Sequence, residues 1–146
     1  MSLIEKQHAL VASLANVKDA QERFAWLVRR GQAQPPLAPE LKCDAHRVEG
    51  CLAVLWFVAE VREARCFFLT DSDSLIVKGI AGVLSEFYSG ATPREIVKLD
   101  PSFLGRAGID QLLTPNRRNS LSRVWEKIHA FASAQLTEHD ATLRCA

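Results

Sequence analysis

The sequence has almost no net charge and no long apolar run. Its 146 residues carry 18 Lys and Arg against 17 Asp and Glu, so the chain lacks the basic field that holds a nucleic-acid backbone. The longest uncharged apolar run, residues 51–59, is far shorter than the roughly 20 residues of a membrane-spanning helix. Charged residues soon after Met1 leave no apolar core for a signal peptide. We therefore expect a cytoplasmic protein that binds neither nucleic acid nor membrane.

Cysteine is present, but without the spacing of a structural zinc site. Cys43, Cys51, Cys66 and Cys145 include no C-x-x-C pair. A chain of this length buries enough apolar surface to fold without disulfides or metal. We therefore expect no metal and no cofactor, and expect most of the four thiols to be inert.

The chain has no repeat and no low-complexity tract, so residues 1–146 are expected to form a single domain. Asp71 and Asp73 are expected to cap a central helix, and residues 135–146 are expected to be a frayed tail. This order of elements predicts the α+β class, with helices around a small antiparallel sheet. Apolar spacing, capping residues and β-forming residues predict helices over 3–17, 19–31, 71–90, 92–99 and 116–134, a brief helix closed by 112–115, and strands over 47–61 and 66–69.

One cysteine has a distinctive setting. Cys51 follows Gly50 between a polar approach and an apolar strand, which permits a thiol at a loop tip and close approach of another chain. The alternative is that Gly50 is an ordinary turn glycine and Cys51 the first buried residue of a strand. His46 would have to act as the base of a cysteine hydrolase, but no local signature of such a site accompanies it.

Three blocks of sequence resemble the SufE family of sulfur acceptors, which includes the CsdE branch. They are V-E-G-C-L-A-V-L-W over 48–56, D-S-D-S-L-I-V-K-G-I over 71–80 and L-T-P-N-R-R-N-S-L over 113–121. The helix that begins near Asp19 and the turn after Gly31 also match, so the resemblance covers about residues 5–132. The chain departs from the family pattern at Ala53, where the family has Ser, at Leu55 (Val), Thr70 (Gly), Asn116 (Ser) and Ser120 (Gly).

The resemblance implies a SufE/NifU-like (IscU-like) fold and a persulfide carrier rather than an enzyme. Such a carrier takes sulfur from a pyridoxal-phosphate cysteine desulfurase of the SufS/CsdA kind onto Cys51 and stimulates the desulfurase. It passes the sulfur to iron–sulfur cluster assembly, with a SufBCD-like scaffold as the recipient.

Further residues of the matching blocks are expected to support Cys51. Gly50 gives the loop its freedom, Asp73 holds the loop or meets a partner, and Arg117 is either a cation near the thiol or an ordinary surface cation. The apolar neighbours Leu52, Val54 and Trp56 are expected to shelter a persulfide.

Two other functions stay open. A NifU/IscU-like iron–sulfur scaffold or binding module would need Cys43 or Cys66 to converge with Cys51. A cysteine hydrolase would turn over a thioester or amide without a partner protein.

Overall fold

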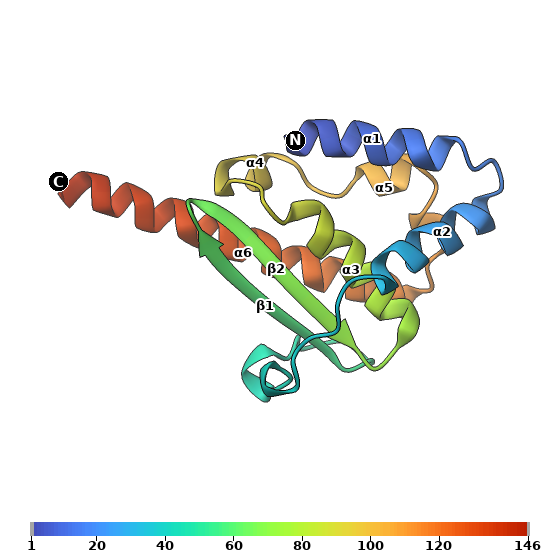
Figure 1. Ribbon diagram of the computed structural model, residues 1–146, viewed down its shortest axis with the longest axis horizontal. Coiled ribbons are helices and arrows are strands. Elements are labelled where there is room, and N and C mark those ends of the chain that lie inside the picture. Colours follow the sequence, from blue (N-terminus) through green and yellow to red (C-terminus); the bar gives the residue numbers. More distant parts are fainter. Residues whose placement is uncertain (1, 146) are drawn as a thin grey trace.

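The structure is a computed structural model that describes residues 2–145, with side chains described for residues 2–137. Two helices are followed by a β-hairpin and then by further helices (Figure 1). This arrangement confirms the α+β class predicted from the sequence. The elements are α1 (Leu3–Ala15), α2 (Ala20–Gln32), η1 (Pro39–Leu41), η2 (Asp44–His46), β1 (Leu55–Arg62), β2 (Arg65–Ser72), α3 (Leu75–Tyr88), α4 (Pro93–Lys98), α5 (Phe103–Arg106), η3 (Asp110–Leu112) and α6 (Pro115–Cys145).

The hairpin pairs β1 with β2 in antiparallel register along all eight residues of each strand. Glu63 and Ala64 connect the strands with φ angles of 51° and 64°, the left-handed pair that a two-residue hairpin turn requires. α3 packs against β2 and α6 against β1, and the ring of Phe68 on β2 lies 5.9 Å from that of Phe131 on α6. The two helices therefore pack against the hairpin, α3 on β2 and α6 on β1.

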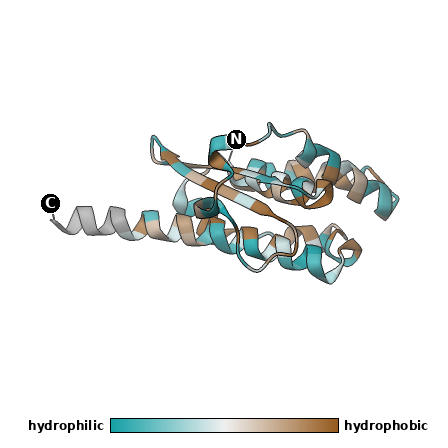
Figure 2. Cartoon of the chain, turned by 90° about the horizontal axis from the view of Figure 1, so that it is seen from below, coloured by the Kyte–Doolittle hydropathy of each residue, from teal (hydrophilic) through white to brown (hydrophobic). Residues whose placement is uncertain are grey.

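α6 is amphipathic over its described side chains. Figure 2 shows hydrophobic and hydrophilic residues alternating along this helix. Leu121, Val124, Ile128 and Ala132 are buried at helical spacing, while charged residues occupy the opposite side. In the part of the chain that the structure describes, no helix combines the length and the apolar character needed to cross a membrane.

α2 and α3 cross with their backbones in direct contact. A Cβ atom on Gly79 would lie 2.7 Å from the carbonyl oxygen of Val28, and a Cβ atom on Gly31 would overlap the carbonyl of Gly79. Only glycine allows two helices to approach this closely. The crossing fixes the N-terminal half of α3, which begins next to the loop that carries Cys51.

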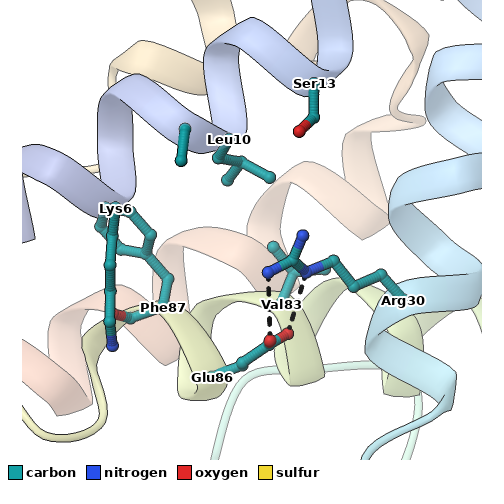
Figure 3. Close-up of a pocket in the computed structure, with 8 residues that line it drawn as sticks. Lys6, Leu10, Ser13, Arg30, Val83, Glu86 and Phe87 are labelled. Atoms are coloured by element: carbon teal, nitrogen blue, oxygen red, sulfur yellow. Dashed lines mark hydrogen bonds and ion pairs between the residues drawn. The ribbon is translucent and has the colours of Figure 1, made fainter. Parts of the chain in front are cut away.

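α1 lies over α2 and α3 and leaves a hollow of about 240 Å³ between them (Figure 3). Arg30 of α2 points into the hollow and pairs with Glu86 of α3 through two contacts of 3.2 Å. Lys6 of α1 donates hydrogen bonds to the carbonyls of Phe87 and Ser89, at 3.2 and 2.8 Å. Burial lowers the pKa of Lys6, an effect that the nearby Glu86 opposes. The hollow lies where three helices pack, and its described lining includes no cysteine.

Three element boundaries in the structure differ from those expected. The strand expected from residue 47 begins at Leu55, because residues 49–54 form a loop. The N-cap of α3 is Ser74, whose hydroxyl accepts from the Val77 N–H at 3.3 Å, rather than Asp71 or Asp73. α6 continues to Cys145, past the expected end at 134, because no Gly or Pro interrupts the sequence there.

Candidate functional site

The loop that carries Cys51 is closed at its base by main-chain contacts. The Val48 N–H donates to the carbonyl of Leu55 at 2.8 Å, and Arg47 bridges to Trp56 of β1. Gly50, inside this closed segment, has a φ of +83°, a left-handed conformation that costs other residues about 1–2 kcal/mol. The glycine before the cysteine is therefore required by the backbone of the loop.

Asp73 and Ser72 hold the end of the loop. The Val54 N–H donates to Asp73 Oδ1 at 3.0 Å, and the Asp73 N–H donates to the Val54 carbonyl at 3.2 Å. The Ser72 hydroxyl donates to the same carbonyl at 2.7 Å. The structure thus places Asp73 against the Cys51 loop. Its contact is with Val54, which lies three residues after Cys51 in the sequence.

The tip of the loop rests on α6. Asn119 Nδ2 donates to the Gly50 carbonyl at 2.7 Å. The Arg123 guanidinium lies over Gly50, with its Nε atom 3.0 Å from the position that a Cβ atom would take. Sequence reasoning missed both residues: their i, i+4 spacing on a predicted helix puts them on one face, but nothing local indicates that this face meets Gly50.

Cys51 lies between the core and the surface. Its side chain is half-buried and packs against the hydrophobic core, as does that of Ala53. Leu52 between them is 82% exposed, so it does not shelter the thiol as expected. A hollow of about 250 Å³ lies beside the loop. It is lined by Leu52, Ala53, Ser74, Val77, Thr114, Asn116, Arg117 and Ser120.

Arg117 lines this hollow together with Leu52 and Ala53, the two residues that follow Cys51. Its backbone N–H is capped by the Thr114 hydroxyl at 3.3 Å. Within the described residues its guanidinium forms neither a hydrogen bond nor an ion pair. The structure therefore places this cation at the site, with its charge unpaired by these residues.

Asp71 is a buried anchor rather than a helix cap. Only 3% of the residue is exposed, and its carboxylate accepts from the N–H groups of Leu37 and Ser72 and pairs with Lys42 and Lys78. Burial alone raises the pKa of this carboxyl, but the two N–H donors and the two ammonium groups outweigh it, so that the pKa of Asp71 lies below its usual value. Through Leu37 and Lys42, Asp71 ties the segment between α2 and β1 to β2, close to the end of the Cys51 loop.

Replacing Asp71 with Asn is expected to lower the free energy of unfolding at pH 7 by about 1–3 kcal/mol, the cost of leaving buried partners unsatisfied. Because the pKa is lowered in the folded state, the stabilisation is complete above the unfolded-state pKa of about 3.9 and is lost as the pH falls through the folded-state value. Urea titrations between pH 7 and pH 3 should show the two proteins converging at the acid end. Asp44→Asn, at an exposed carboxylate, is the control; a pH-independent difference for Asp71→Asn would contradict the electrostatic explanation.

Cys43 and Cys66 have settings that differ from that of Cys51. Cys43 is exposed, with its Sγ atom 3.5 Å from Nδ1 of His46. Cys66 is fully buried, and burial raises the pKa of its thiol to about 11. It pairs with Val61, six residues along β1 from Leu55, which is roughly 20 Å at about 3.4 Å per residue. The side chain of Cys145 lies outside the described residues.

In the part of the chain that the structure describes, His46 does not pair with Cys51, and no cluster of metal-binding side chains surrounds the thiol. His46 Nδ1 lies 2.8 Å from the Leu41 carbonyl, so this ring is engaged with its own segment. Among the residues that the structure describes, His46 forms no hydrogen bond with Cys51. In the same part of the chain, no three His, Cys, Asp or Glu side chains are grouped so as to hold a metal ion.

Comparison with known proteins gives consistent matches. The family model described as "SufE: Fe-S metabolism associated domain" matches residues 8–132. An uncharacterised SufE-like protein of Synechocystis is 31% identical over 116 residues, which cover 80% of this chain and 73% of that protein. A chloroplastic and mitochondrial SufE-like protein of Arabidopsis thaliana is 32% identical over 117 residues, which cover 80% of this chain but only 32% of the plant protein.

A solved structure has the same fold. The solution structure of a hypothetical protein from Thermus thermophilus superposes with a TM-score of 0.73 and covers 90% of this chain and 96% of its own. At 22% identity, this likeness concerns the fold alone. The family model over residues 8–132 and the Synechocystis relative show that the chain is a member of the SufE family, whose domain is associated with iron–sulfur metabolism.

Proposed function

We propose that this protein is a sulfur acceptor that carries a persulfide on Cys51, taken from a cysteine desulfurase. The observation that carries the proposal is the position of this thiol: it lies half-buried on a loop tip whose next residue, Leu52, is 82% exposed. A second protein can reach such a thiol after a small movement of the tip. A buried thiol such as that of Cys66 offers no such access.

The transfer needs only a thiolate and a donor persulfide. The Cys51 thiolate attacks the outer sulfur of the donor's persulfide, and a new sulfur–sulfur bond forms as the bond between the donor's outer and inner sulfurs breaks. The inner sulfur leaves as the donor's thiolate, and the outer sulfur stays on Cys51. No oxidant or reductant is consumed, because one sulfur–sulfur bond replaces another.

The residues around Cys51 have roles suited to this exchange. Asp73 holds the loop by accepting from Val54, and Arg117 places a positive charge at the adjacent hollow, where it favours an anionic sulfur. Ala53 supplies no hydroxyl, so the exchange does not depend on a hydrogen bond at that position. We assign the protein a carrier role, with a SufS/CsdA-like desulfurase as donor and a SufBCD-like scaffold as recipient.

The two alternatives have less support from the positions of the cysteines. An iron–sulfur scaffold needs several thiolates around one cluster, but Cys51 and Cys66 lie at opposite ends of the hairpin. A cysteine hydrolase needs an imidazole beside the nucleophile, whereas His46 faces Cys43 and the Leu41 carbonyl. Neither arrangement supplies the groups that the alternative chemistry uses.

Mass spectrometry tests the proposal directly. After incubation with a cysteine desulfurase and cysteine, we expect the peptide containing Cys51 to gain about 32 Da, the mass of one sulfur, without a reductant. The peptide containing the exposed Cys43 serves as an internal control and should gain little. Sulfur on Cys43 with none on Cys51 would reject the proposal.

A further inference from the structure

Among the residues that the structure describes, one hydrogen bond holds the tip of the Cys51 loop, residues 49–53. Main-chain contacts of Val48 and Val54 tie only the two ends of the loop. Among the described residues, the one hydrogen bond between the tip and the rest of the chain is that from Asn119 Nδ2 to the Gly50 carbonyl, at 2.7 Å. This carbonyl belongs to the peptide bond that leads into Cys51, so the bond fixes the backbone directly before the thiol.

Arg123 adds a packing contact to the same point. Its Nε, Nη2 and Cζ atoms lie 3.0 to 3.2 Å from the position of a Cβ atom on Gly50. Glu126 orients the guanidinium through a 3.4 Å contact with Nη1. Asn119 and Arg123, one turn apart on α6, thus form an α6 clamp over Gly50: one holds its carbonyl and the other fills the space above its Cα atom.

We propose that Asn119 is the positioning residue that sets how far the Cys51 thiol is exposed. With the Asn119–Gly50 bond made, the tip stays against α6 and Cys51 packs on the core. When the bond opens, nothing but apolar contact and the Arg123 side chain retains the tip. Asn119 is itself exposed, so water or a polar group of a docking protein competes for its amide. The inference deepens the proposed function, because it concerns the presentation of the same thiol.

Alkylation of Cys51 by iodoacetamide, with no desulfurase present, measures this exposure. Trypsin cleaves after Arg47 and Arg62, so Cys51 is the one cysteine in its peptide, and Cys43 lies in another. We expect Asn119→Ala to raise the alkylation rate constant of Cys51 by about three- to tenfold, the range that one neutral hydrogen bond gives. Asn119→Gln keeps an amide donor and should restore most of the slow rate.

Two controls separate positioning from general loosening. Ser122→Ala changes an exposed residue on the same helix and should leave the Cys51 rate unchanged. The Cys43 peptide should react equally fast in every variant. An unchanged Cys51 rate in Asn119→Ala would overturn the proposal, as would faster alkylation of both cysteines or a Gln variant as fast as the Ala variant.

The outcome is independent of the proposed function, because iodoacetamide replaces the sulfur donor. If Cys51 alkylation responds to Asn119 while no sulfur reaches Cys51 from any desulfurase, the clamp stands and the carrier function fails. If sulfur loading occurs but alkylation is the same in all variants, the carrier function stands and the clamp fails.

Discussion

We expect Cys51→Ser to abolish the proposed stimulation of a cysteine desulfurase, so that turnover falls to the rate of the desulfurase alone. A serine hydroxyl is close in size to the thiol, so the loop and its contacts with Asp73 and Asn119 are retained. The hydroxyl, however, is not a nucleophile toward the outer sulfur of a persulfide at neutral pH, because it does not ionise as a thiol does. The measurement is alanine released from cysteine per desulfurase, at increasing concentrations of the variant.

The matched control is Cys43→Ser, which removes an exposed thiol outside the Cys51 loop. We expect this variant to stimulate as well as the unchanged protein. Stimulation that survives in Cys51→Ser would show that the protein activates the desulfurase by docking alone. Stimulation lost in both variants would show that two thiols pass the sulfur in sequence.

Gly31→Ala should lower the free energy of unfolding by at least about 3 kcal/mol, at the upper end of overpacking effects. The added methyl group overlaps the Gly79 carbonyl, and a backbone carbonyl cannot rotate away as a side chain does. α2 and α3 must therefore separate, which also displaces the start of α3 beside Asp73. Urea titration measures the loss, and an insoluble or unfolded product is the extreme form of the same result.

Gly90→Ala is the control for this substitution. Gly90 has a φ of +86°, and no atom lies within 4 Å of the position that a Cβ atom would take there. The change adds left-handed strain of about 1–2 kcal/mol and no overlap. Equal losses for Gly31→Ala and Gly90→Ala would mean that backbone strain, and not the helix crossing, explains the effect.

Local features were predictable from the sequence. Asp19 caps α2 and Thr92 forms a capping box with Glu95, as their spacing predicts, because all the atoms concerned lie within one helical turn. The apolar stripe of α3 and the antiparallel strands were predictable for the same reason: periodicity is a property of short segments.

Features that depend on distant partners were not predictable in this way. Asp71 has the sequence position of a capping acid, yet it is buried because Leu37 and Lys42, more than 25 residues earlier, bring a donor and a charge to it. Asn119 has no local feature that marks it, and its contact depends on which face of α6 meets Gly50. For Cys51 and Arg117, the family resemblance supplied the expectation, and in the fold Arg117 lines a hollow together with Leu52 and Ala53, the two residues that follow Cys51.

The bond between Asn119 and Gly50 joins residues 69 positions apart, and this separation matters during synthesis. During synthesis the residues of the Cys51 loop are made before those of α6, so the bond to the Gly50 carbonyl forms only once Asn119 has been added. Loop closure over such a distance is among the slower contacts to form in a small domain. The half-buried position of Cys51 therefore includes a contact that forms only after α6 has been made and packed against the loop.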